Sequence, residues 1–259
     1  MRQAPLDRCE ASEFFVVVPM YNEAQGLRAT IRALAGQSDQ GFTLVLVDNG
    51  STDATVPVAQ TTAATLPTLR MHVIHEPQKG TGAAADTGFR YAISQGARWI
   101  ARTDADCIPC PDWIQQLKQA LVTHGLEFVA GRIQPRDDEP HTRLDRVLMW
   151  ITLWVAEHYG WLFRHGRRFK YPYMMVPGAN LGIAASLYVR CGGFPRTAID
   201  DVHEDHVLSE TIRTITDRAA LLPRLIVHHS ARRLRAYGYI NTLRWYRNRG
   251  FRPSVVDVR

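Results

Sequence analysis

Short β-rich segments alternate with helical ones through the first half of this 259-residue chain, and that alternation restricts the fold more than any other feature. Runs of valine, isoleucine, leucine and phenylalanine predict five strands, at residues 14–18, 43–47, 70–75, 98–103 and 126–130. Four helices are predicted between them, at 24–35, 52–65, 80–95 and 111–123. Strands that alternate with helices form βαβ units, so we predict an α/β fold with a mainly parallel, Rossmann-like sheet flanked by helices.

The second half of the chain is less regular. We predict a polar loop at 134–141, an aromatic helix at 147–156, a loop entering a strand at 171–184, a helix at 203–214, a strand at 225–229 and a basic aromatic helix at 237–249. The sequence contains neither an internal repeat nor a linker. It therefore predicts one domain over residues 1–230, with a basic, aromatic C-terminal extension at 231–259 packed on it.

The charge and the cysteines narrow the classes of partner. A net charge of +6 favours nucleic acid, an anionic membrane or a polyanionic small molecule as partner. Cys107 and Cys110 form a Cys-x-x-Cys, but no second pair stands at zinc-finger spacing, and Pro109 and Pro111 predict a stiff turn there. Four cysteines in a chain of this length do not indicate a disulfide framework.

Residues 1–12 lack the apolar segment of a signal peptide, so we expect a cytoplasmic protein. The apolar part of the helix predicted at 147–156 is far shorter than the roughly 20 residues that a membrane span needs. Aromatic and basic residues surround it. Two interpretations stay open for this helix, burial in the core and peripheral contact with a membrane surface.

Polar clusters follow three of the predicted strands, at residues 21–23, 48–53 and 104–106. Ligands of parallel sheets bind beyond the carboxyl ends of the strands, which is where these clusters fall. Asp104 and Asp106 stand one residue apart, and a carboxylate pair of this kind can hold a divalent cation beside a ribose. The pair predicts the handling of a nucleoside diphosphate, whereas an isolated Asp-x-Asp is more often a solvated turn.

Several short motifs follow one another along the chain: Val17 to Glu23, Val47 to Asp53, Lys79 to Gly82, Asp104 to Asp106, Gly178 to Asn180, Gly192 to Phe194 and Glu204-Asp205. Together they resemble the inverting, nucleotide-sugar-dependent glycosyltransferases of family 2, which have the GT-A fold. The resemblance covers about residues 14–230, with a donor half at 14–130 and an acceptor half at 131–230. Each motif is weak alone, but their order and spacing make a specific signal.

The resemblance implies a nucleotide site and a metal site. The nucleotide-binding residues would be Pro19, Tyr21, Glu23, Asp48, Lys79 and Asp104. The base of a UDP or GDP donor would donate an N–H to Asp48, and Asp104 would face the ribose. Asp106 would bind Mn²⁺ or Mg²⁺ together with His229, or with His228, because strand alternation brings only one of the two histidines to the site. Asp53 is expected to cap the helix that follows it.

On the acceptor side, the resemblance implies that Asp205 is the general base, with Asn180 and Glu204 facing the acceptor. An acidic helix N-terminus is the alternative interpretation of the 200–206 segment. A Gln-x-x-Arg-Trp motif of processive synthases is missing, so we expect transfer of a single sugar. The acceptor is unknown, and the aromatic and basic residues suggest one carried on a lipid.

The sequence departs from the family pattern after the Lys79 to Gly82 motif, and it leaves three rival functions open. Ala85 and Asp86 stand where the family often carries Arg-Asn, so an arginine contact from that loop is not expected. Residues 80–85 also fit the dinucleotide fingerprint G-x-G-x-x-A, but a polar loop rather than a strand precedes them. The other rivals are a sugar nucleotidyltransferase and a non-catalytic module that binds nucleotides or nucleic acid. No recognised nucleic-acid-binding fold is present, so we do not expect nucleic acid as a partner.

Overall fold

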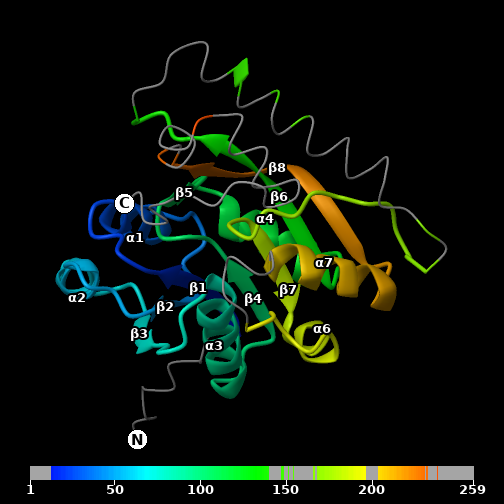
Figure 1. The fold of residues 1–259 in the computed structure, drawn as a ribbon, viewed down its shortest axis with the longest axis horizontal. Helices are drawn as coiled ribbons and strands as arrows, with labels where there is room; N and C mark the ends of the chain where they lie inside the picture. The colour runs from blue at the N-terminus through cyan, green and yellow to red at the C-terminus, as the bar shows by residue number, and fades with distance from the viewer. Residues whose placement is uncertain are drawn as a thin grey trace, which may run out of the picture.

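The computed structural model describes residues 13–139, 168–196 and 204–230, together with residues 147, 148, 151, 154, 166, 232 and 238. One curled, eight-stranded sheet runs through these residues in the order β3-β2-β1-β4-β7-β6-β8-β5 (Figure 1). Helices cover both of its faces. The α/β fold with a mainly parallel sheet is thus confirmed.

The first four strands are parallel and come from the regular half of the chain. They are β1 (Phe14–Met20), β2 (Thr43–Asp48), β3 (Met71–His75) and β4 (Trp99–Arg102). The helices that connect them are α1 (Leu27–Ala35), α2 (Thr55–Ala64) and α3 (Thr81–Ser94). These four strands and three helices were all predicted, and their bounds differ from the prediction by three residues at most.

The other four strands bring a change of direction. β7 (Leu181–Ala184) lies antiparallel to β4 on one side and to β6 (Phe128–Pro135) on the other. β8 (Ala219–His229) is parallel to β6, and β5 (Cys107–Pro109) pairs antiparallel with β8 at the edge of the sheet. The helices here are α4 (Trp113–Lys118), which continues in a π-helical turn at Gln119–Thr123 (η1), α6 (Ala185–Arg190) and α7 (Glu204–Ile215).

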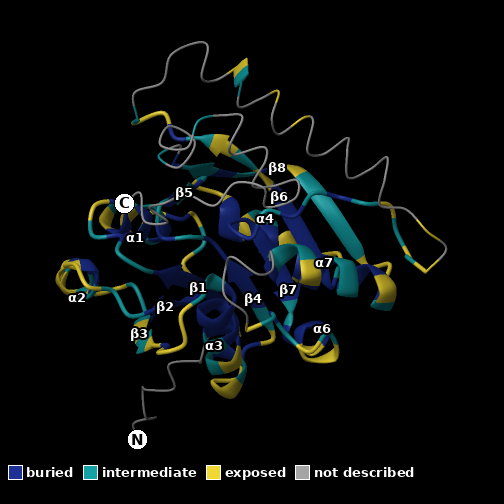
Figure 2. Cartoon of the chain, in the orientation of Figure 1, coloured by how far each residue is buried: buried dark blue, intermediate teal, exposed yellow. Residues whose placement is uncertain are grey.

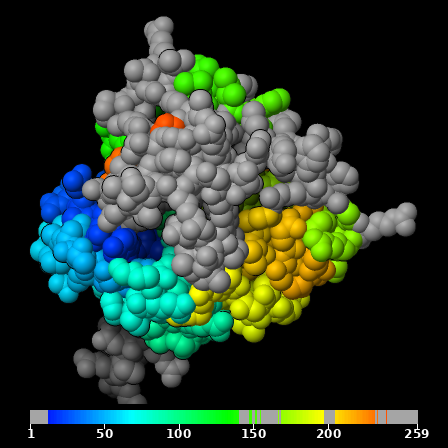
Figure 3. All heavy atoms as spheres, in the orientation of Figure 1, coloured from blue at the N-terminus to red at the C-terminus, as the bar shows by residue number. Residues whose placement is uncertain are grey.

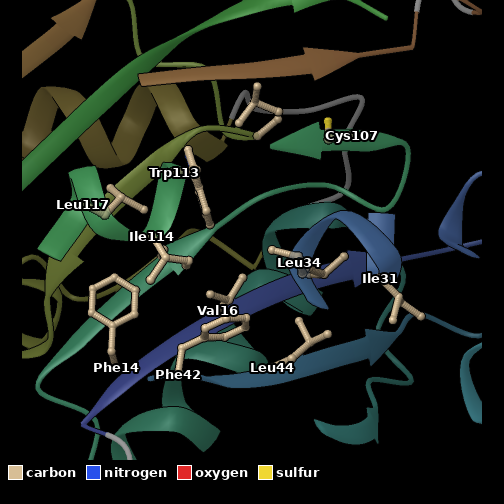
Figure 4. Packing of buried hydrophobic residues seen from close by; sticks show 14 of the residues in the cluster. Phe14, Val16, Ile31, Leu34, Phe42, Leu44, Cys107, Trp113, Ile114 and Leu117 are labelled. Carbon is tan, nitrogen blue, oxygen red and sulfur yellow. The ribbon is translucent and has the colours of Figure 1, made fainter. Parts of the chain in front are cut away.

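Burial on both faces of the sheet explains why β1 is apolar throughout its length. All seven residues of β1 are buried, because alternate side chains enter two separate cores (Figure 2). Phe14 and Val16 pack on the side of α1 and α4, where Ile31, Leu34 and Trp113 meet them (Figure 4). The opposite side chains of β1 belong to the core that α3, α6 and α7 cover.

Helix α3 lies unusually close to the sheet. A Cβ at Gly88 would come within 2.4 Å of Val17 Cγ1 and 2.8 Å of Val47 Cγ2, so only glycine permits this approach. The surfaces of α3, α6 and α7 adjoin one another on the face shown in Figure 3. This close packing fixes where the N-terminus of α3 meets the strand ends.

Three sequence expectations were wrong in detail. The strand expected at 126–130 extends to Pro135, so the loop predicted at 134–141 begins inside β6. The strand expected at 225–229 begins earlier, at Ala219. Cys107–Pro109 is a strand rather than a stiff turn, because an edge strand tolerates a proline that cannot donate a hydrogen bond. Helix α6 was not expected from the sequence.

Some predictions fall outside the described residues. These include the basic helix at 237–249 and most of the extension at 231–259, so the division into domains stays a prediction. Only four residues of the helix predicted at 147–156 are described. Among the residues that the structure places, no helix is both long and apolar enough to cross a membrane.

Candidate active site

An open cleft lies at the carboxyl ends of the parallel strands. Residues that follow β1, β2 and β4 line it, together with the start of α3 and the end of β8. Its lining includes Pro19, Tyr21, Glu23, Asp104, Asp106 and His229. Six of the residues predicted for the nucleotide and the metal, from three distant parts of the sequence, therefore share one cleft.

The turn after β1 is tied to the turn after β2. Asn22 has a φ of 51°, a left-handed conformation that asparagine tolerates better than most residues. Its side-chain oxygen accepts a hydrogen bond from Thr52 N at 2.8 Å, and its own N–H donates to Ser51 Oγ at 3.1 Å. Asp53 accepts from the N–H of Thr55, the first residue of α2, but the N-cap of that helix is Ala54, so the cap predicted at Asp53 was wrong by one residue.

Asp48 is mostly buried at the end of β2. Its carboxylate accepts hydrogen bonds from Ser51 N at 3.1 Å and Gly50 N at 3.3 Å, and it lies 3.2 Å from His75 Nδ1. In this structure the side chain therefore stabilises its own turn. Contact with a nucleobase stays a prediction for Asp48.

Lys79 and Asn49 organise the loop that leads into α3. Lys79 Nζ donates to the carbonyls of Asn49 and Gly50, at 3.1 and 2.9 Å, and lies 3.8 Å from the ring centroid of Tyr21. The amide of Asn49 donates to the Glu76 carbonyl and accepts from Gly80 N. Asn49 had no role in the sequence-based prediction, although it lines the cleft and holds this loop in place.

Asp104 is connected to the start of α7 through a buried arginine. Arg102, at the end of β4, is 1% exposed. Its Nε donates to Asp104 Oδ1 at 3.2 Å, and its Nη2 donates to Glu204 Oε1 at 3.1 Å. The pKa of Arg102 is raised, against the effect of burial, by the neighbouring carboxylates of Asp104, Glu204 and Asp205. One guanidinium thus joins the two predicted halves of the site.

Asp106 has different neighbours on its two oxygens. Oδ1 lies 3.8 Å from His229 Nε2 and 3.5 Å from Cys107 Sγ. Oδ2 lies 3.7 Å from Arg232 Nη2, which also donates to Glu23 Oε2 at 2.6 Å. His228 instead has its Nε2 3.7 Å from Cys110 Sγ. Of the two histidines, the structure brings His229 beside Asp106.

The residues around Asp106 fit a divalent cation. His229 Nδ1 lies 2.6 Å from the Ser230 carbonyl, which can only accept, so Nδ1 carries the proton. Nε2 is then left with the lone pair that a metal ligand needs, on the side of Asp106. Carboxylate and imidazole are both ligands for Mn²⁺ and similar ions.

Asp205 lies at the first turn of α7, half-buried. Its Oδ2 accepts from Gly178 N at 3.0 Å and its Oδ1 from His206 N at 2.7 Å. Burial and the neighbouring Glu204 raise the pKa of Asp205 to about 6, while Arg102 opposes that rise. Glu204 itself turns toward Arg102. A carboxyl group that titrates near neutral pH is suited to proton transfer.

Asn180 lies in the core and not in the cleft. It is 0% exposed, and its Nδ2 donates to the carbonyls of Arg132 and Leu225 at 2.9 Å each. Its Oδ1 accepts from Trp113 Nε1 at 2.8 Å. The expected acceptor contact of Asn180 is corrected accordingly, because its side chain cross-links α4, β6 and β8 instead.

Asp86, one of the two departures from the family pattern, is the centre of a buried ionic network. It is 0% exposed and accepts hydrogen bonds from Tyr188 Oη at 2.8 Å and Arg90 Nε at 2.8 Å. Arg196 reaches it as well, at 3.2 Å, and also binds Glu76 at 2.7 Å. The network ties α3 to the segment that precedes α7, and so has a structural role.

Arg102 and Arg232 are functional candidates that were not predicted from the sequence. A charged residue closing the apolar strand Trp99–Arg102 was a signal for Arg102, since a buried charge in a strand needs partners. Arg232 gave no such signal, because it belongs to a generally basic stretch.

The fold is one that known structures share. The mannosyltransferase PcManGT from Pyrobaculum calidifontis, solved in complex with GDP-Man and Mn²⁺, matches with a TM-score of 0.63 and 23% identity. The match covers 93% of this chain and 65% of that one. At such an identity the likeness shows the fold alone, which is the GT-A fold expected from the sequence.

The sequence comparison then gives the family. The model described as glycosyl transferase family 2 matches residues 15–188, and the chain belongs to this family. Glycosyltransferase AglE of Haloferax volcanii is 30% identical over 121 residues, which are 46% of this chain and 38% of that protein. Polyprenol monophosphomannose synthase of Mycolicibacterium smegmatis is 34% identical over 117 residues, 45% of this chain and 43% of that protein. Each match thus spans less than half the length of the relative.

Proposed function

We propose that this protein is an inverting glycosyltransferase that moves one sugar from a nucleoside-diphosphate sugar to an acceptor hydroxyl with the help of a divalent cation. The observation that carries the proposal is the meeting of Asp104, Asp106 and His229 in one cleft with Tyr21 and Glu23. A carboxylate pair beside an imidazole is the arrangement needed to bind a metal-bound diphosphate.

The donor is proposed to be a UDP or GDP sugar. PcManGT was solved with GDP-Man and Mn²⁺, and this supports the donor class and a cation such as Mn²⁺. Asp106 and His229 would hold the cation, and Asp104 would face the ribose. When bound, the cation neutralises the negative charge that develops on the leaving diphosphate.

Asp205 is proposed to take the proton of the acceptor hydroxyl as that oxygen attacks the anomeric carbon. Its pKa of about 6 leaves it mainly ionised at neutral pH, yet basic enough to accept a proton. The hydrogen bond from Gly178 N fixes Oδ2. Arg102, which pairs with Glu204, keeps the neighbouring carboxylate from facing the acceptor.

The acceptor is proposed to be carried on a lipid phosphate. The name of the Mycolicibacterium smegmatis relative, a polyprenol monophosphomannose synthase, supports this class. Val147, Ile151 and Trp154 are exposed apolar residues in helical conformation, and their spacing places them on one side of a helix. Such an acceptor would bring the enzyme to the surface of a membrane.

The donor side is tested by thermal unfolding with UDP, GDP, dTDP or CMP, each with Mn²⁺, Mg²⁺ or EDTA. A ligand that binds only the folded state, at roughly 100 times its Kd, should raise the Tm by about 5–10 °C. We expect one of the uridine or guanosine nucleotides to do so with Mn²⁺ and to lose the effect in EDTA.

Two variants make this test specific. Asp106→Asn should abolish the Mn²⁺-dependent shift, whereas Asp217→Asn, which changes an exposed carboxylate, should retain it. The proposal fails if none of the nucleotides shifts the Tm with either cation. It also fails if Asp106→Asn responds as the wild type does.

A further inference from the structure

Cys107 is placed opposite His229 by the register of the sheet. The two residues are direct partners in the antiparallel pair of β5 and β8. Directly opposed residues of such a pair have their side chains on the same face, with Cβ atoms about 4.5–5.5 Å apart. Asp106 immediately precedes β5, so the backbone delivers a carboxylate, a thiol and an imidazole to one place.

The ligand atoms of these three residues have the spacing of a metal site. Asp106 Oδ1 lies 3.5 Å from Cys107 Sγ and 3.8 Å from His229 Nε2, and the three ligand atoms lie within 4.8 Å of one another. Around a tetrahedral ion with bonds of about 2.0–2.3 Å, neighbouring ligand atoms are roughly 3.3–3.6 Å apart. The two shorter separations differ from that by a few tenths of an ångström.

We propose that the Cys107 thiolate is the third protein ligand of the cation held by Asp106 and His229, and that the site consequently prefers Zn²⁺ and Co²⁺ to Mg²⁺. Thiolate selects borderline and soft ions, whereas a site of oxygen atoms alone suits Mg²⁺. The inference rests on the proposed function, because it concerns the same cation. It adds a ligand that lies outside the motifs found in the sequence.

Two arginines beside Asp106 approach atoms other than Oδ1. Arg232 approaches Oδ2, whereas Cys107 and His229 approach Oδ1. Arg136 donates to the backbone carbonyl of Asp106 at 3.2 Å, away from these three ligand atoms. Binding would exchange the S–H bond of Cys107 for a metal–sulfur bond, and the proton would leave to solvent.

The structure supplies a matched control on the other face of the same strand pair. Ile108 is the partner of His228 in the register, and Cys110 Sγ lies 3.7 Å from His228 Nε2. Cys110 and His228 thus form a second cysteine and histidine pair, separate from the one beside Asp106. Loss of Cys110 should leave the cation site intact.

The test is a Co²⁺ titration of the metal-stripped, reduced protein, followed by absorbance. A cobalt–thiolate bond produces a charge-transfer band in the near ultraviolet. We expect the band in the wild type and in Cys110→Ser, and its absence in Cys107→Ser and Cys107→Ala. Competition with Zn²⁺ should show an affinity at least about tenfold lower in both Cys107 variants than in Cys110→Ser, since a direct ligand should count for at least as much as an outer partner. Circular dichroism checks that each variant is folded.

The outcomes separate this inference from the proposed function. If Co²⁺ binds without the band while Mn²⁺ still supports nucleotide binding, the Cys107 ligand is wrong and the proposed function stands. A band that Cys110→Ser loses and Cys107→Ser retains also overturns the inference. If neither Co²⁺ nor Mn²⁺ binds, both proposals fail together.

Discussion

Two pairs of acidic residues are predicted for the site, and their surroundings differ. Asp104 and Asp106, after β4, line an open cleft, and Asp106 lies near His229 and Arg232. Glu204 and Asp205 are neighbours at the start of α7. Burial, together with the negative charge of Glu204, raises the pKa of Asp205. The first environment suits carboxylates that bind a cation. The second suits a carboxyl group that exchanges a proton.

Arg102 lies between the two pairs and contacts both. Its fully buried guanidinium binds Asp104 on one side and Glu204 on the other. The two pairs consist of similar residues, and their burial and their partners give them different chemistry. The buried guanidinium of Arg102 sets the distance between the two pairs. Substitutions in these pairs and in Arg102 should therefore have different effects on transfer and on stability.

The largest effect is expected for Asp205→Asn, which removes the proposed base and leaves the proposed cation site untouched. Transfer should fall by about 10²–10⁴-fold, the usual contribution of a general base. Donor binding, measured by the Mn²⁺-dependent rise in Tm, should remain. Transfer at the wild-type rate would show that Asp205 is not the base. The proposed difference in function between the two acidic pairs would then be wrong.

Arg102→Met should break the connection between the two pairs. Removing one partner of a buried ion pair usually costs about 3–5 kcal/mol, because the remaining charges stay buried without compensation. Urea unfolding measures the change in free energy. Arg98→Met is the matched control, since Arg98 pairs with Glu13 at the surface and should change stability by about 1 kcal/mol or less. Equal effects of the two variants would contradict the role given to Arg102.

Asn180→Leu tests whether Asn180 belongs to the core or to the acceptor side. The substitution leaves Trp113 Nε1 and the Leu225 carbonyl without their partner, and each unsatisfied buried group costs about 1–3 kcal/mol. We expect a loss of about 2–6 kcal/mol in the free energy of unfolding, by summing two such groups. A normal stability together with a raised acceptor KM would instead return Asn180 to the acceptor side.

The smallest effect expected is the dependence of activity and stability on pH through Asp205. Because the pKa of Asp205 is about 6, kcat/KM should fall by about tenfold per pH unit below that value. The raised pKa also means that protonated Asp205 stabilises the fold below its ordinary pKa of 3.8, and that this contribution is lost as the pH rises through about 6. In Asp205→Asn, this contribution to stability should be absent over that pH range, and so should the fall of kcat/KM at low pH. If the residual activity of Asp205→Asn still falls at low pH as in the wild type, another group is responsible for the titration.

The regular half of the chain was predictable because its signals are local. Apolar strands buried on both faces, such as β1, read as continuous hydrophobic segments, and the polar clusters at their ends fall at the edge where parallel strands bind ligands. Asp104 and Asp106 could be found in this way. The resemblance of the motifs then named the family correctly.

The second half was predicted less well because its elements depend on pairing. β5 is only three residues long and is defined by hydrogen bonds to β8, more than a hundred residues away in the chain. Asn180 looked like a site residue, since a buried asparagine and an exposed one have the same letter in a sequence. Only the burial of its side chain and its three hydrogen-bond partners distinguish them.

The sequence by itself determined the fold class, the family and the cluster of carboxylates at the strand ends, because periodicity and motif spacing are properties of neighbouring residues. Tertiary structure alone decided which histidine meets Asp106, that Cys107 joins them, and that Arg102 links Asp104 to Glu204. These contacts depend on sheet register and burial, and a shift of one residue in register would exchange His229 for His228.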